Sequence, residues 1–84
     1  MAYQLNKTDG TLLTDLVDGQ IDNTTTNLVL VGRNYSGYGE AFNENFIKLL
    51  ENFANTAAPT NPMTGQVWWN SSEQRLKVYD GTQW

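Results

Sequence analysis

The sequence contains no cysteine and no histidine, and these two absences restrict its chemistry. Without cysteine no disulfide can staple the fold, although a chain of only 84 residues buries a modest share of its surface. The common nucleophile and base pairs of hydrolases are missing as well, and a metal site would depend on carboxylates and amides. We therefore expect no enzymatic activity, no cofactor and no metal site.

Basic residues and long apolar runs are also scarce. Five Lys and Arg stand against nine Asp and Glu, which gives a net charge of −4, and the basic residues are scattered. Proteins that bind nucleic acid present clustered positive charge to the phosphate backbone, so nucleic acid is not an expected partner. No apolar run approaches the ~20 residues needed to span a bilayer, and membrane insertion is not expected.

All three tryptophans fall in residues 65–84, which read GQVWWNSSEQRLKVYDGTQW. The polar residues 70–74 separate two runs with strand character. Asp80-Gly81 is a strong hairpin signal because both residues tolerate positive φ. The pattern predicts a three-strand β-meander.

The register of the first two strands can be predicted from their apolar residues. Pairing Trp69 with Leu76 and Val67 with Val78 makes one face apolar, whereas a one-residue slip would scatter these side chains. We expect Trp69 to be packed and leave the burial of its neighbour open. The other face carries a candidate interface or glycan contact that consists of Trp68, Lys77, Tyr79 and Trp84.

This second face has two interpretations. The register puts Lys77 between the indoles of Trp68 and Trp84, where cation–π contacts can form. Such a row can be a packing device that keeps the strands in register. It can also dock another subunit or a sugar ring, since aromatic faces stack on sugars.

Residues 1–54 are predicted to form a β-rich module that ends in a helix. Two short strands flank the turn at Asp9-Gly10, although residues 12–17 also fit one helical face. After a turn at Asp18-Gly19, residues 28–31 (LVLV) are predicted as a fully buried strand, because their apolar side chains point to both faces.

Residues 40–55 carry the clearest helix signal. An apolar stripe recurs there at helical spacing, and it consists of Phe42, Phe46, Leu49, Leu50 and Phe53. We predict that the stripe faces the core, so that Phe46→Ala would cost ~3 to 5 kcal/mol. So thin a sheet covers only part of it, and the rest is expected to contact another chain.

Two segments flank this helix. The loop at residues 32–39 (GRNYSGYG) lacks the Gly-Lys-Ser/Thr end of a phosphate-binding loop, and Glu40 would repel phosphate. Residues 55–64 contain two prolines without periodicity and predict a linker to the module at 65–84. The fold class is therefore α+β: a small β-rich module with one amphipathic helix and a C-terminal three-strand β-meander.

Residues 62–84 resemble a short module of tail-fibre and other virion proteins of tailed bacteriophages, with Gly-Gln-x-Trp-Trp followed by Leu-Lys-Val-Tyr-Asp-Gly-x-x-Trp. The matching positions are Gly65, Gln66, Trp68, Trp69, Leu76, Lys77, Val78, Tyr79, Asp80, Gly81 and Trp84. Residues 3–22 and 34–54 are similar to the start of structural proteins from contractile-tailed phages of marine cyanobacteria. Such proteins usually continue past this module, so we expect a fragment or a short member.

The resemblance implies a non-enzymatic structural or attachment segment of a tail fibre or related virion protein. It also implies a homo-oligomer, a trimer, that contacts other virion proteins and is assembled in the host cytoplasm before it resides in the virion. Two alternatives stay open. One is a carbohydrate-binding module that recognises host-surface glycans through Trp68 and Trp84, and the other is a small host-directed protein-binding module.

Overall fold

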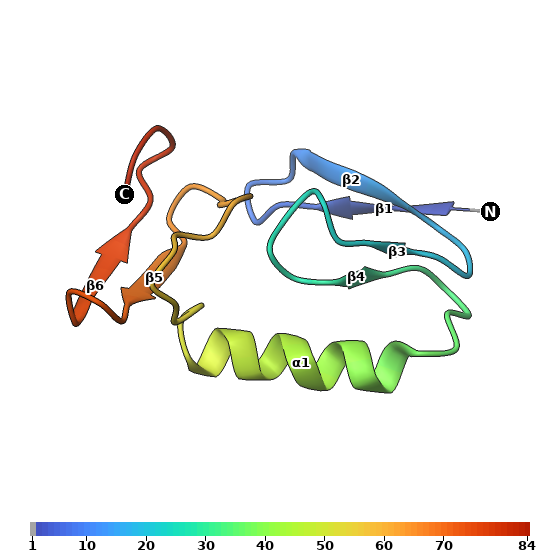
Figure 1. Cartoon of the computed structure of the whole chain (residues 1–84). Helices are drawn as coiled ribbons and strands as arrows, with labels where there is room; N and C mark the ends of the chain where they lie inside the picture. Colours follow the sequence, from blue (N-terminus) through green and yellow to red (C-terminus); the bar gives the residue numbers. More distant parts are fainter. Residues whose placement is uncertain (1) are drawn as a thin grey trace.

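The computed structural model describes residues 2–84, which form three two-stranded antiparallel sheets and one helix (Figure 1). The paired strands are β1 (Ala2–Asn6) with β2 (Leu12–Val17), β3 (Ile21–Asp22) with β4 (Leu30–Val31), and β5 (Val67–Asn70) with β6 (Arg75–Val78). The helix α1 spans Tyr38–Leu50. The predicted α+β class, rich in β structure and with one amphipathic helix, is confirmed.

The first hairpin forms where strands were predicted, and residues 12–17 are not helical. Alternate residues of β1 are half-buried, as expected for a strand with one covered face. The turn between β1 and β2 uses the positive φ of Gly10, and the Asp9 carboxylate accepts hydrogen bonds from the amide and hydroxyl of Thr11. Tyr3 lies opposite Leu16, the most deeply buried apolar residue of this sheet.

Polar contacts fix α1 on the β3 and β4 hairpin, which separates the helix from β1 and β2 (Figure 1). The side-chain oxygen of Asn45 accepts a hydrogen bond from the backbone N–H of Val29 at 2.9 Å. The side-chain nitrogen of Asn45 donates to the backbone carbonyl of Val29 at 2.8 Å. The Lys48 ammonium donates to the Asn27 carbonyl at 3.2 Å. Ala41 is buried on the same side of the helix.

These contacts explain why the prediction for residues 28–31 is wrong. Only Leu30–Val31 is a strand, and all four residues are half-buried. Asn45 occupies the backbone groups of Val29, where a further strand would have paired. A side chain of the helix thus replaces part of the expected sheet.

The helix ends at Leu50, earlier than the predicted end near residue 55. Asn52 and Phe53 adopt φ of 53° and 56°, which turns the chain away from the helix axis. The Phe53 amide donates to the Lys48 carbonyl at 2.8 Å and so closes the last turn.

The prediction of a third strand in the C-terminal meander is wrong. After β6, the Asp80 carboxylate accepts from the Thr82 amide and hydroxyl and from the Gln83 amide. The Asp80 amide donates to the Gln83 carbonyl at 3.0 Å. The chain is therefore held in a local turn, and the C-terminal residues do not pair with β6.

Residues 52–61 connect the helix to the last hairpin through hydrogen bonds on both sides. The backbone N–H of Trp69 donates a hydrogen bond to the Asn52 carbonyl, and the Trp69 carbonyl accepts one from the backbone N–H of Asn55. At the other end, the Asn61 amide donates to the Asn27 side chain at 2.8 Å. The proposed boundary of the two modules thus lies in a segment that is bonded to its neighbours.

The described residues contain very little core. Their buried apolar side chains are Leu16, Ala41 and Trp68, and no large side chain is less than 2% exposed. The accessible surface is 5805 Å². Folded monomers of this mass expose about 5,000 Å², so the chain leaves several hundred Å² more surface in water than expected. The flat shape, with extents of 43 × 27 × 16 Å, accounts for this excess.

Candidate functional site

The part of the predicted apolar stripe that lies on α1 is exposed, so the prediction that it faces the core is wrong there, whereas Phe53, beyond the helix end, is half-buried. Phe46 is 58% exposed and Leu50 is 78% exposed, while Phe42 and Leu49 are about half exposed. The polar contacts of Asn45 and Lys48 turn a different side of the helix toward β4. Phe46→Ala is therefore expected to cost ~1 kcal/mol in the isolated chain, well below the value for a buried phenylalanine.

The second site predicted from the sequence lies on the β5 and β6 hairpin, and its register is confirmed. Trp68 lies opposite Lys77, and Trp69 lies opposite Leu76. The Lys77 ammonium lies 5.7 Å from the Trp68 ring and forms an ion pair with Glu73 at 2.7 Å. The sequence pattern therefore identified the correct neighbours across this pair of strands.

Trp84 takes a different place from the predicted one. Its ring lies 5.5 Å from that of Trp68 and 5.2 Å from that of Tyr79. Since the two indoles contact each other directly, Lys77 does not lie between them. The candidate residues form an aromatic cluster of Trp68, Tyr79 and Trp84, with Lys77 over the Trp68 ring.

The expectation that Trp69 is packed is wrong, and the burial of Trp68, which the sequence left open, is settled. Trp68 is 5% exposed, and its indole Nε1 donates to the Asn55 carbonyl at 3.3 Å. Trp69 is 38% exposed on the opposite face, beside the exposed Leu76 and Val78. Asn55 and Trp84 contact Trp68 on its side of the hairpin, and no segment of residues 2–84 pairs with the free edge of β6.

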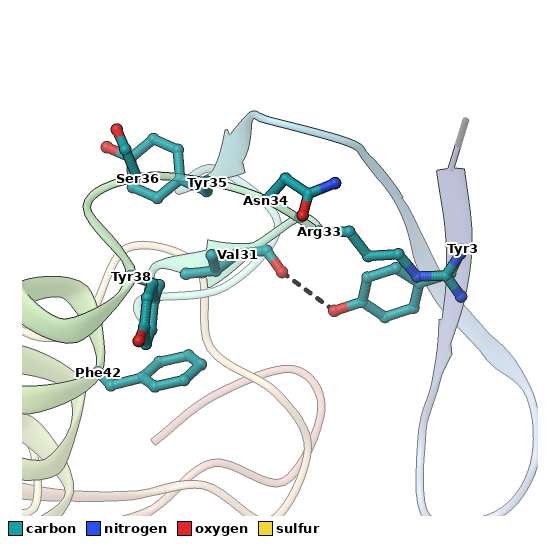
Figure 2. Close-up of a pocket in the computed structure, with 9 residues that line it drawn as sticks. Tyr3, Val31, Arg33, Asn34, Tyr35, Ser36, Tyr38 and Phe42 are labelled. Atoms are coloured by element: carbon teal, nitrogen blue, oxygen red, sulfur yellow. Dashed lines mark hydrogen bonds between the residues drawn. The ribbon is translucent and has the colours of Figure 1, made fainter.

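A groove that the sequence did not predict lies where β1, β4 and the start of α1 meet (Figure 2). It is open to solvent, has a volume of about 630 Å³, and is lined by Tyr3, Val31, Gly32, Arg33, Asn34, Tyr35, Ser36, Tyr38 and Phe42. The Tyr3 hydroxyl donates to the Val31 carbonyl at 3.0 Å, and the Arg33 guanidinium lies 5.1 Å from the Tyr3 ring. In the sequence, only the tyrosines of residues 32–39 could have indicated this groove.

Tyr38 and Phe42 join this groove to the apolar stripe. Their rings meet edge to face with centroids 6.0 Å apart, and Figure 2 shows both projecting from the start of the helix. Both side chains are exposed. The exposed apolar surface of α1 therefore extends over its whole length, from Tyr38 to Leu50.

Three aspartates, Asp9, Asp22 and Asp80, accept hydrogen bonds within turns. Asp22 accepts hydrogen bonds from Thr25, Thr24 and Thr14, which lower the pKa of its carboxyl well below 3.8. Hydrogen bonds from Thr11 likewise lower the pKa of Asp9. The spacing Asp-x-Thr recurs at residues 9–11, 22–24 and 80–82, and in each case the aspartate accepts a hydrogen bond from the threonine hydroxyl.

Within residues 2–84, no three acidic side chains gather as they would around a metal ion. The same residues contain no helix with the length and apolar character required to cross a membrane. Comparisons of this protein with protein-family models, with curated proteins and with solved structures found no match.

Proposed function

We propose that this chain is a non-enzymatic structural segment of a virion protein of a tailed bacteriophage, and that it works through contacts with other subunits. The resemblance of residues 62–84 to a tail-fibre module supports the phage origin. The thin fold supports the dependence on partners, because small domains without disulfides need additional burial to be stable.

One observation carries the proposal: the described residues expose many more large apolar side chains than they bury. Twelve large apolar residues are between 38% and 78% exposed, against three buried apolar residues. Single exposed apolar residues are ordinary, but a run of them along one helix marks a contact surface. The chain therefore carries the surface of a subunit that packs against other protein.

Binding of host glycans is the second candidate, and the residues that support it differ from those predicted from the sequence. Trp68 is buried under Trp84, so its ring is not free to stack on a sugar. The groove in Figure 2 offers the open rings and a guanidinium that sugar recognition commonly uses. Titration of the chain with oligosaccharides, followed by amide chemical shifts around Tyr38, tests this candidate.

Mass spectrometry of purified virions of the phage that encodes the chain tests the proposed function. We expect the protein in intact particles at a fixed copy number that survives washing in high salt. A protein that is abundant in infected cells and absent from particles would contradict the proposal. That result would favour a host-directed protein-binding module instead.

A further inference from the structure

We propose that α1 packs along α1 of a second copy of this chain through an apolar seam, which we define as Phe42, Phe46 and Leu49. The inference rests on the proposed function, since it names the partner and the surface of one subunit contact. It concerns side chains that the fold leaves in solvent. Their spacing matches that of a pair of identical helices, no charged residue flanks them, and their exposed area is large for a monomer.

The spacing of the seam matches that of a helix pair. Residues 42, 46 and 49 follow the steps of four and three that place side chains at positions a and d of a heptad. Such positions form one line that an identical line on a second helix can interdigitate with. Phe53 continues the spacing beyond the helix end.

The helix is also free to accept a partner on this side. Its contacts with the β3 and β4 hairpin use Ala41 and Lys48, which lie on a different side from the seam, and Asn45, which borders the seam and is already bonded to Val29. A second helix would therefore add to the existing packing without displacing it.

The positions of the charges allow a second copy to approach along the seam. The chain carries a net charge of −4, so identical copies repel unless their charges stay apart. On the heptad defined by the seam, Glu40, Glu44 and Glu51 fall at outer positions. The residues that flank the seam within the helix are Tyr38, Asn43, Asn45 and Leu50, none of which is charged. The approach of two copies along the seam therefore brings no like charges together.

The exposed apolar area of the helix is large for a monomer. An aromatic side chain presents 150 to 250 Å² when free, so the half-exposed side chains from Tyr38 to Leu50 offer on the order of 500 Å² of apolar surface. This value is at the upper end for a patch on a monomer, where larger patches mark interfaces. A standard interface takes about 800 Å² per partner, so the apolar surface of the helix supplies more than half of that area.

Light scattering after size exclusion of the full chain at about 100 µM tests the inference with two variants. Phe46→Glu places a charge in the seam, and Leu12→Glu makes the same change at similar exposure on β2. We expect the wild type and Leu12→Glu to have a multiple of the 9.5 kDa chain mass, and Phe46→Glu to lose affinity at least ~10-fold and run as a monomer. A monomeric wild type, or association that Phe46→Glu leaves intact, would overturn the inference.

Disulfide trapping gives a second readout, because the chain has no cysteine of its own. Phe46 lies at the middle of the seam, so its two copies meet in a parallel or an antiparallel pair. Phe46→Cys should form a covalent dimer on mild oxidation, and Glu44→Cys, at an outer position, should not. Equal trapping of the two variants, or trapping of Glu44→Cys alone, would contradict the seam. A protein that is present in virions but monomeric in isolation would refute this inference and leave the proposed function intact.

Discussion

Trp84 packs edge to face against Trp68, with ring centroids 5.5 Å apart, although the two residues come from opposite ends of the C-terminal module. This contact, together with the packing of Trp84 on Tyr79, holds the C-terminal residues on the hairpin without a third strand. Aromatic pairs of this geometry contribute ~0.5 to 1.5 kcal/mol beyond their buried area. The aromatic cluster is therefore the small core of residues 65–84.

The two adjacent tryptophans should differ strongly on substitution. Trp68→Ala removes a buried indole and its hydrogen bond to Asn55, at a cost of ~3 to 5 kcal/mol. Trp69→Ala removes a side chain that is 38% exposed and should cost ~1 to 2 kcal/mol. Urea denaturation measures both. Equal midpoints would show that the face assignment of β5 is incorrect.

Asn45 should be the most important polar residue of α1. Asn45→Ala leaves the amide and carbonyl of Val29 without their partner and should cost ~1 to 3 kcal/mol. Asn43→Ala, two residues away on the exposed side, should change stability by less than ~0.5 kcal/mol. Equal Tm values for the two variants would show that Asn45 does not hold the helix against the β3 and β4 hairpin.

Gly32 should tolerate no side chain. A Cβ at this position would collide with the Val17 carbonyl, and the Gly32 amide also donates to Gln20 at 2.8 Å. Gly32→Ala is thus expected to cost several kcal/mol through a forced backbone shift. Gly39→Ala lies in the helix with open space around its Cβ and should stabilise the fold by ~0.5 to 1 kcal/mol. Circular dichroism melts of the pair would show opposite shifts in Tm.

Asp22 should make the fold sensitive to acid. Its hydrogen bonds from Thr25 and Thr24 favour the ionised form, so its pKa is lower in the folded chain than in the unfolded chain. Because the pKa of Asp22 is lower in the folded chain, its ionised carboxylate stabilises the fold above pH ~4, and this stabilisation is lost progressively as the pH falls below that value. Denaturation midpoints at pH 7 and pH 3 should differ less for Asp22→Asn than for the wild type. Asp15→Asn, which removes a charge from an exposed position of β2, should keep the wild-type difference.

The sequence predicted the local pattern well where side chains alternate. The register of Trp68 with Lys77 follows from the period-two pattern and is confirmed, and residues 12–17, where the sequence left strand and helix open, form a strand beside the predicted turn. These features depend on neighbouring residues, so a single sequence contains the information.

The predictions that failed concern features that depend on contacts between distant segments of the chain. The orientation of α1 is set by Asn45 and its bonds to Val29, which an apolar stripe does not reveal. The burial of Trp68 depends on Asn55 and Trp84, and the groove in Figure 2 combines Tyr3 with residues 31–42. The hydrophobic pattern placed Phe46 in the core, but its side chain is 58% exposed.

The central claim is that contacts between subunits complete this fold, and the concentration dependence of thermal unfolding tests it most directly. Because association stabilises only the folded chain, the Tm of the wild type should rise by several degrees between about 2 µM and 200 µM. Phe46→Glu should show the same Tm at both concentrations. A wild-type Tm that does not change over this range, in a sample whose mass stays at 9.5 kDa, would contradict the account.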